Sequence, residues 1–427
     1  MQDLQKRKVL DFLGLFHLSF WVVIGLTPFW VSCEKEEEPI IVVERGEPEN
    51  LTGLLESNRT LRNKYSASDA PDYVVTGICK VLNATLKIEA GVIIYFAEDA
   101  GLEISDNAIL EVCGNEDNKV VFTGLSPIPG FWRGILIQSE RPCFIKHAEI
   151  HFGGGRRWSN EVHQSNLLVA GKDASSPTNM SVDVHDCLIA DSPQFGISFS
   201  TALKKVSLQR NVFRRNGLSP VICPSYLLSD IDVESSDYTE NGHNGIFLIN
   251  GLLVLDDVFY GNYASNSYDY TTTHLKKLPE GGSYRGEILI NNPVTLDPGV
   301  IIEIPPGYKT SFSKGVTAIG TPDEKIIFRN IPGKGNFARI SLTFINLSST
   351  MEHCIISNGG SDEIPPANEA PASISVGPGH KLYLSNSLIQ NSESCGVALY
   401  GTPSIHLAEI IQSNNTFLNN TGEDICD

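Results

Sequence analysis

The chain lacks most of the patterns that mark a metal site, a helical fold or a nucleic-acid partner. Its nine cysteines include no Cys-x-x-Cys pair, so a zinc site of that spacing is not expected. It has 32 basic against 50 acidic residues, a formal net charge of −18. That balance excludes a nucleic-acid partner and adhesion to anionic lipid through charge. No window in 73–427 sustains an apolar period of 3.6 residues over three turns, so this part is predicted to be all β.

Short apolar strands and their glycines occur twice in the chain. The matching pieces are Ala90–Ile94 with Pro298–Ile302, Val120–Phe122 with Ile326–Phe328, and His147–Gly154 with His353–Gly360. The offsets between the copies are 208, 206 and 206 residues, so the register holds through the block. A duplication of this kind is typical of a protein built from stacked coils.

The spacing of later strand ends gives the length of one coil. Ile189, Phe213, Tyr238 and Phe259 are separated by 24, 25 and 21 residues, and a polar turn closely follows each. Three short strands and three turns fit this length, whereas a propeller blade needs about 40–45 residues. Asparagine is expected at the same corner of successive coils, because it tolerates left-handed backbone and can bond to its stacked copies.

A family resemblance adds to this prediction. Gly91–Phe96, Ile109–Gly114, Val121–Gly124 and Pro129–Ile135 resemble the opening coils of right-handed parallel β-helix proteins of bacterial surfaces, within the pectin-lyase-like class. The likeness covers residues 73–427. It implies an all-β, right-handed parallel β-helix solenoid built from two related halves, with an N-terminal cap. Trp132 is predicted to be a structural plug, which Phe337 replaces in the second copy.

The first 33 residues are typical of an export signal. Lys6, Arg7 and Lys8 precede an apolar run that Asp11, His17 and Pro28 interrupt. The sequence that ends in Cys33 resembles a bacterial lipoprotein box, and the acidic run 34–38 resembles the surface-export signal of Bacteroidetes lipoproteins. The resemblance implies lipidation of Cys33 and an outer-membrane, surface-exposed protein that meets the membrane through its lipid anchor only. A plain acidic linker after an ordinary signal anchor is the alternative.

These observations divide the chain into five parts. They are a signal peptide at 1–32, a lipidated tether and cap at 33–72, a first β-helix half at 73–259, an irregular tyrosine-rich junction at 260–284, and a second half at 285–427. A short helix at 51–62 is expected to cover the open end of the first coil. Among the eight cysteines other than Cys33, buried free thiols are favoured over bridges. The pairs that could be bridged are Cys79 with Cys113, and Cys395 with Cys426.

Candidate catalytic residues form one predicted column. Alignment of the strand ends stacks His147, Asp186, Arg210 and Asp256, one residue in each coil, with about 4.8 Å between neighbouring coils. Enzymes of the resembled fold cut acidic polysaccharides, so this column is where a lyase or glycosidase centre would lie. The corresponding residues of the second half are His353, Asn386 and Asn414, and a solvated surface column is the favoured interpretation.

Candidate ligand-binding residues lie in two irregular stretches. The basic, aromatic insertion at 153–177 could flank a groove, and the tyrosines of the junction suit stacking on sugar rings or packing over the junction. The predicted binding residues are Arg156, Arg157, Trp158, His163, Tyr263, Tyr268 and Tyr270.

The resulting hypothesis is a surface protein that binds a polysaccharide or a cell-surface ligand without catalysis. The alternatives are a polysaccharide lyase or glycoside hydrolase that acts on acidic polysaccharide, and a structural surface protein. No Gly-Gly-x-Gly-x-Asp calcium loop occurs, and neither a cofactor nor a metal is predicted.

Overall fold

The computed structural model describes residues 46–426, except for 66–69, 159–162, 172–180, 201–202, 204, 250–252, 256–257, 261–272, 287, 291–292, 343–345, 362–370 and 400–407. The chain divides into the units Met1–Gly46 and Glu47–Asp427, and the fold described here is that of the second unit. The predicted signal, Cys33, Asp256, Tyr263, Tyr268 and Tyr270 lie outside the described residues. None of the helices in the described part is long and apolar enough to cross a membrane.

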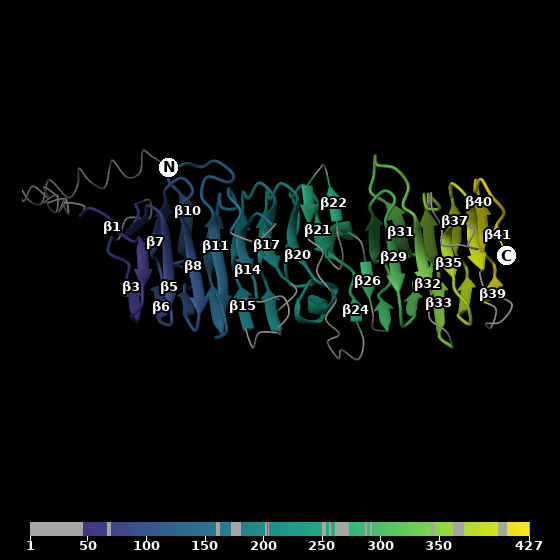
Figure 1. Ribbon diagram of the computed structural model, residues 1–427, viewed down its shortest axis with the longest axis horizontal. Helices are drawn as coiled ribbons and strands as arrows, with labels where there is room; N and C mark the ends of the chain where they lie inside the picture. Colours follow the sequence, from purple (N-terminus) through teal and green to yellow (C-terminus); the bar gives the residue numbers. More distant parts are fainter. Residues whose placement is uncertain are drawn as a thin grey trace, which may run out of the picture. The chain divides into compact units, whose positions relative to one another are not determined.

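The unit is a parallel β-helix, as the sequence predicts. Its strands stack from β1 to β41 in five parallel sheets, and successive strands of the chain belong to different sheets (Figure 1). The exception among the described strands is the antiparallel pair β22 (Leu253–Leu255) and β23 (Val258–Tyr260). Two short 3₁₀ helices, η1 (Ser225–Asp230) and η2 (Pro279–Gly281), lie in the middle of the chain.

One sheet of fourteen strands, called the long sheet below, passes through both halves. Its strands are β2 (Gly53–Leu55), β5 (Ile78–Leu82), β8 (Gly101–Asp106), β11 (Gly134–Ser139), β14 (Ser165–Val169), β17 (Phe195–Phe199), β20 (Ser219–Cys223), β21 (Gly245–Leu248), β25 (Ser283–Gly286), β28 (Ile301–Ile304), β31 (Ile326–Asn330), β34 (Cys354–Ser357), β37 (Leu388–Gln390) and β40 (Thr416–Leu418).

The other two faces of the first half end before the junction. The first face consists of β1 (Glu49–Asn50), β4 (Tyr73–Val75), β7 (Ile93–Phe96), β10 (Val120–Gly124), β13 (Ala148–His151), β16 (Leu188–Ala190) and β19 (Val212–Arg214). The second consists of β3 (Arg59–Leu61), β6 (Thr85–Glu89), β9 (Ile109–Cys113), β12 (Cys143–Lys146), β15 (Ser181–His185) and β18 (Lys205–Gln209).

Two new sheets complete the second half. One contains β24 (Thr273–Leu275), β27 (Val294–Leu296), β30 (Val316–Ile319), β33 (Ser348–Glu352), β36 (Lys381–Ser385) and β39 (Glu409–Ser413). The other contains β26 (Ile288–Ile290), β29 (Lys309–Phe312), β32 (Arg339–Leu342), β35 (Ala372–Val376), β38 (Cys395–Leu399) and β41 (Ile425–Cys426). The change of sheets falls between β20 and β26, which brackets the predicted junction.

The two copies of the repeat do not continue in the same sheet. Strands β10 and β13 belong to a seven-stranded face of the first half, whereas their sequence copies β31 and β34 belong to the long sheet. Before the junction, the long sheet contains the strand that follows the repeated one, as β11 follows β10. After the junction, it contains the repeated strand itself, such as β31. The repeated sequence specifies a coil, but stacking at the junction decides which face that coil joins.

Alternating side chains fill the interior of the coils, as the period of two in a strand requires. In β12, for example, Cys143 and Ile145 are buried while Phe144 and Lys146 are partly exposed. Trp132 is fully buried, stacks on Phe96 with 3.9 Å between ring centroids, and donates its Nε1–H to the carbonyl of His151 at 2.7 Å. Phe337 is equally buried in the second half, so both predicted plugs are confirmed.

The N-terminal cap helix predicted at 51–62 is wrong. This segment contains β2 and β3, which pair with β5 and β6 as strands of the first coil. Leu61 is buried because it joins the core rather than covering it. The described coils therefore begin at Glu49, earlier than the predicted start at Tyr73.

One disulfide occurs among the described cysteines. It joins Cys395 to Cys426 and ties the last coil to the one before it, whereas Cys79 and Cys113 are free thiols. Of the two pairs singled out in the sequence, the second is therefore bonded and the first is not. Cys187 and Cys354 are buried and free, as predicted.

Candidate functional site

The predicted charged column exists, and it follows a corner of the coil. His147, Asp186 and Arg210 all have left-handed backbone, with φ of 46°, 58° and 51°. Arg210 donates two hydrogen bonds to Asp186, each 2.8 Å long. His185, which the sequence analysis did not single out, lies 2.7 Å from the same carboxylate. The structure thus brings Asp186 and Arg210 together, and His147 acts on Asp186 through its charge.

This column is poorly suited to acid–base catalysis. The hydrogen bonds from Arg210, helped by His185, hold the pKa of Asp186 well below its ordinary value, so the carboxyl carries no proton to donate near neutral pH. The Arg210 side chain is half exposed, and none of the three column residues lines either cavity described below. An exposed, paired charge of this kind is typical of a surface corner.

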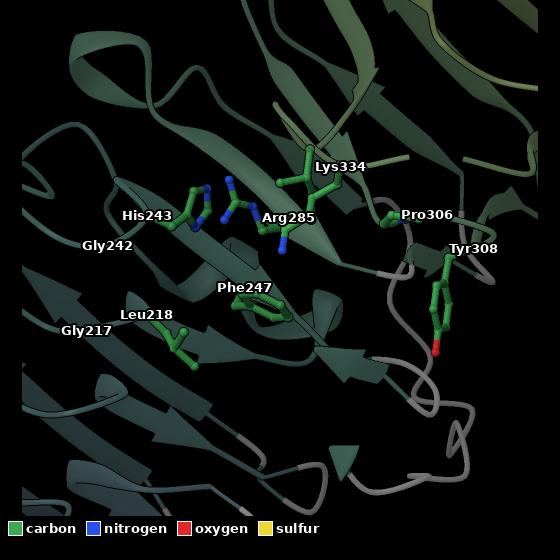
Figure 2. Close-up of a pocket in the computed structure, with 10 residues that line it drawn as sticks. Gly217, Leu218, Gly242, His243, Phe247, Arg285, Pro306, Tyr308 and Lys334 are labelled. Carbon is green, nitrogen blue, oxygen red and sulfur yellow. The ribbon is translucent and has the colours of Figure 1, made fainter. Parts of the chain in front are cut away.

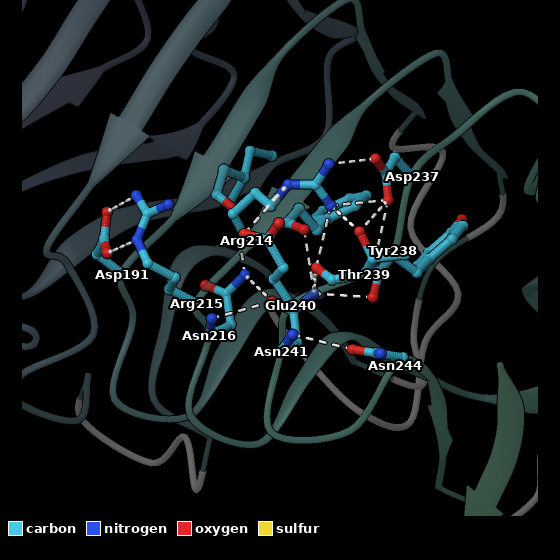
Figure 3. Close-up of polar contacts among 12 residues, drawn as sticks. Asp191, Arg214, Arg215, Asn216, Asp237, Tyr238, Thr239, Glu240, Asn241 and Asn244 are labelled. Carbon is cyan, nitrogen blue, oxygen red and sulfur yellow. Dashed lines mark hydrogen bonds and ion pairs between the residues drawn. The ribbon is translucent and has the colours of Figure 1, made fainter. Parts of the chain in front are cut away.

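A second corner carries a polar network that the sequence analysis did not single out as a site. Arg215 donates to both oxygens of Asp191 at 2.7 and 2.8 Å (Figure 3). Asn216 donates its backbone N–H and its side-chain amide to the side-chain oxygen of Asn241, both at 2.9 Å. The predicted hydrogen bonding between stacked asparagines is thereby confirmed. The left-handed positions of this corner, however, are Asp191, Arg215 and Glu240 and not the asparagines.

The described part of the predicted ligand-binding insertion packs against the solenoid. Trp158 and His163 are only 5% and 1% exposed. Trp158 packs against Leu136 and Leu168 on the outer face of the long sheet, so it offers no free face for a sugar. Strand β14 also lies within the predicted insertion, which is therefore partly a regular coil.

The arginines of this insertion have a different environment. Arg156 and Arg157 are exposed, and the guanidinium of Arg156 lies 3.5 Å from Asp99. They do not line the cavity that follows. The predicted binding role of this pair therefore stays a prediction.

The most site-like feature is a cavity on the outer face of the long sheet, beside the junction. Parallel pairing places Phe247, Arg285, Glu303 and Arg329 in one row across β21, β25, β28 and β31. Because side chains alternate along a strand, Arg285 points outward while its neighbour Tyr284 is buried inside the coil. The cavity has a volume of about 260 Å³.

Figure 2 shows how the cavity is built from separate parts of the chain. His243 and Arg285 lie side by side, with Lys334 close to Arg285, and Pro306 and Tyr308 form another part of the lining. The remaining lining residues are Gly217, Leu218, Gly242, Phe247 and Ile331. Apolar walls with a few polar groups are typical of a small-molecule or saccharide subsite.

Glu303 is the buried anchor of this cluster. Its side chain is 4% exposed, and it accepts hydrogen bonds from Arg285 at 2.5 and 3.0 Å and from Arg329 at 2.8 Å. Burial alone would raise the pKa of Glu303, but the two arginines outweigh it and lower that pKa. Glu303 is therefore ionised and holds both guanidinium groups in place.

His243 lies at the same cavity and is neutral at pH 7. Burial, followed by the nearby charge of Arg285, lowers its pKa to about 3. Its Nε2 lies 2.9 Å from the Ser283 hydroxyl and 3.8 Å from Glu303. Its Nδ1 is buried without a hydrogen-bond partner in the described part of the chain.

The cavity is locally basic in an acidic protein. Arg285 and Lys334 line the cavity, and Arg329 lies beside it on Glu303. In the described part of the chain, Glu303 is the one carboxylate bonded to these two arginines, and neutral His243 adds no charge. An anion could approach the side of Arg285 that Glu303 does not occupy. The chain's net charge of −18 would repel an anionic ligand elsewhere on the surface, so the local excess of positive charge favours anion binding at this cavity.

These residues were not predicted as a site. His243 lies in the irregular segment 241–244 directly before β21, where the local sequence gives no hint of a cavity. The available signal was a charged residue directly after a large inward apolar residue in three strands: Tyr284-Arg285, Ile302-Glu303 and Phe328-Arg329.

A second cavity of about 440 Å³ lies where η1 meets the junction. It is lined by Asp230, Asp232 and Glu234, with Lys276 3.6 Å from Glu234. Burial raises the pKa of Asp230. In the described residues, no cluster of three or more histidine, cysteine or carboxylate side chains has the geometry of a metal site.

Comparisons with known proteins add little to this geometry. No protein-family model matches the chain. No curated protein matches it either. Among solved structures the chain is similar to the PL6 family alginate lyase AlyGC, with 9% identity over 88% of this chain and 77% of that one. The TM-score of 0.22 is too low to carry an argument, so the assignment of a parallel β-helix rests on the strand pairing above.

Proposed function

We propose that this protein binds carboxylated polysaccharide, with one uronate unit seated in the cavity beside Arg285. The observation that supports this proposal is the basic cluster on the outer face of the long sheet, where buried Glu303 fixes Arg285 and Arg329. Arg285 keeps its Nη1 group for a ligand, because its recorded bonds to Glu303 use Nε and Nη2 only. Tyr308, which is partly exposed, supplies apolar surface for a sugar ring.

The solenoid suits a polymeric ligand. The row that contains Arg285 continues across neighbouring coils of the long sheet, so further sugar units could lie over adjacent strands (Figure 1). Lipidation at Cys33 and exposure at a bacterial outer surface belong to this proposal, since they would present the solenoid to extracellular polysaccharide. They are tested separately, by labelling with a fatty-acid analogue and by protease access to intact cells.

The binding test compares charge-removing variants on immobilised glycans. Lys334 is exposed, so Lys334→Gln removes a cavity charge without disturbing the core, and Lys314→Gln removes an equal charge in the turn after β29. Residues 34–427 are titrated against oligogalacturonate, oligomannuronate and oligoglucuronate, with neutral oligosaccharides as reference. We expect binding of at least one acid series, weakened about five- to tenfold by Lys334→Gln and unchanged by Lys314→Gln. Equal loss in both variants would show a non-specific charge effect and would overturn the assignment of the cavity.

A lyase is the second candidate, because the same cavity has the groups that β-elimination requires. Arg285 and Lys334 could neutralise the uronate. Tyr308 or His243 could accept the proton next to the carboxylate and return it to the glycosidic oxygen, as the glycosidic C–O bond breaks and a C=C bond forms. Unsaturated product ends, lost in His243→Gln or Tyr308→Phe, would establish this activity.

A glycoside hydrolase fits the cavity poorly. Such an enzyme needs one carboxyl group as acid and another as base or nucleophile. Glu303 is the carboxylate recorded at the cavity in the described residues, and two arginines already occupy it.

A further inference from the structure

His243 has one polar atom that the protein leaves unmatched. The residue is 7% exposed, and its Nδ1 is buried without a hydrogen-bond partner in the described part of the chain. Buried polar atoms are normally paired, and this one needs a partner from outside the chain: a water molecule, or a ligand group that displaces the side chains now covering it. The opposite ring nitrogen, Nε2, is held 2.9 Å from the hydroxyl of Ser283, so the ring is fixed in orientation.

The surroundings of the ring decide which nitrogen carries the proton. Nε2 lies 3.8 Å from the ionised carboxylate of Glu303, and no carboxylate is recorded beside Nδ1. A negative charge on the Nε2 side favours the tautomer with N–H at Nε2. In that tautomer Nδ1 is a hydrogen-bond acceptor and the Ser283 hydroxyl accepts from Nε2.

The guanidinium group of Arg285 supplies a hydrogen-bond donor beside His243. Arg285 lies beside His243 (Figure 2) and is held by Glu303 through Nε and Nη2. Among the described residues its Nη1 group has no hydrogen-bond partner, so it can donate to a carboxylate. The cavity therefore offers a donor for an anion next to an acceptor for a hydroxyl.

We propose that this subsite recognises a hydroxycarboxylate, with the carboxylate on Arg285 and a ring hydroxyl donating to His243 Nδ1. The inference rests on the proposed function and narrows it: it selects uronic acids over sulfated sugars and over carboxylates that lack a hydroxyl. A sulfate ester would satisfy Arg285 but leave Nδ1 unmatched. His243 is thus a specificity-determining residue of the binding site.

The test removes the ligand hydroxyls and the His243 imidazole, first separately and then together, and compares the binding affinities. Galacturonate and glucuronate are compared with tetrahydropyran-2-carboxylate, the same ring acid without hydroxyls, and with inorganic sulfate, by ligand-observed NMR titration. The wild-type protein is compared with His243→Gln, whose amide can reach Ser283 but has no acceptor at the Nδ1 position. We expect at least one uronate to bind about tenfold more tightly than the hydroxyl-free acid to wild type, the effect of one hydrogen bond to a buried acceptor.

In His243→Gln this preference should fall to about onefold, while tetrahydropyran-2-carboxylate binds as in wild type because Arg285 is intact. If uronates and the hydroxyl-free acid bind wild type equally, or sulfate matches the uronates, the inference is overturned and the proposed function stands. If no carboxylate binds wild type, the proposed function fails, and this inference fails with it. The wild-type comparison needs no variant, so it decides the question even if His243→Gln does not fold.

Discussion

The two halves of the solenoid place different side chains at an equivalent left-handed corner of their coils. In the first half the left-handed corner positions are His147, Asp186 and Arg210, and in the second they are His353, Asn386 and Asn414. The second half links its corner through amides, with Asn414 donating to Asn386 at 3.4 Å, where the first half uses an ion pair. A corner therefore requires tolerance of positive φ, and the charges are an option that the fold does not need.

The halves also differ in how they end. The first half runs into the junction, where its two outer faces stop at β18 and β19, while the second half closes with a disulfide between β38 and β41. The cavity lies beside the junction between the two halves, on the long sheet, which both halves share. Three experiments test how far the equivalence of the halves extends.

The largest effect is expected from removing the plugs. Trp132→Ala and Phe337→Ala should each lower the free energy of unfolding by about 3–5 kcal/mol, because each leaves a cavity in the core. Urea denaturation followed by circular dichroism measures the loss, with Leu54→Ala at a half-exposed position as a near-neutral control. A loss below about 1 kcal/mol at Phe337 alone would mean that it is not the equivalent of Trp132.

A smaller effect is expected from opening the disulfide. The bond closes a separation of 31 residues, for which chain entropy predicts about 3–4 kcal/mol, less any structure left in the reduced unfolded chain. The Cys395→Ser, Cys426→Ser variant should lose amide protection in β39–β41 and keep it in the first half, as measured by hydrogen exchange. Loss of protection in both halves would show that the solenoid unfolds as one unit. Cys113→Ser is the control.

The smallest effect is expected from acid on the first half. His151, together with Lys119, lowers the pKa of Glu149 to about 2, and Arg214 lowers that of Asp237 to about 2. A folded-state pKa below the unfolded value of about 4 gives stability that is complete above pH 5 and is lost as the pH falls towards 2.

Pepsin digestion at stepped pH measures this loss. First cleavages below pH 4 should fall between β1 and β21, although Glu303 gives the second half one carboxylate with a lowered pKa of its own. Glu149→Gln should weaken the pH dependence of first-half cleavage, and Glu116→Gln, at an exposed position with no ion pair recorded, should not. Cleavage that begins in the second half would contradict the assignment.

Much of the fold could be predicted from local sequence. Strand length, polar turns and the repeated block identify the coils, and the offset of 206–208 residues identifies the halves. Trp132 and Phe337 could be paired as plugs because each lies between a copied strand, Val120–Phe122 or Ile326–Phe328, and the copied glycine pair that follows it. The helix predicted at 51–62 failed because short polar strands in a first coil have no sequence signal apart from the coil they pair with.

The candidate site could not be predicted in the same way. Phe247, Arg285, Glu303 and Arg329 are 38, 18 and 26 residues apart, so no single coil length aligns them. The column that the sequence did align, around Asp186, proved to be a paired surface corner. The regular spacing of strand ends identified a corner of the regular coils, whereas the cavity lies beside the irregular junction.

The sequence by itself determined the coil, because period-two apolar strands and left-handed asparagine or charged corners are local properties of the chain. Only the tertiary structure decided which face each coil joins, since strands β10 and β31 share a sequence pattern but lie in different sheets. That choice depends on how coils of unequal length stack across the junction. It places Arg285 beside Glu303 and His243, and so it creates the basic cavity on which the proposed function rests.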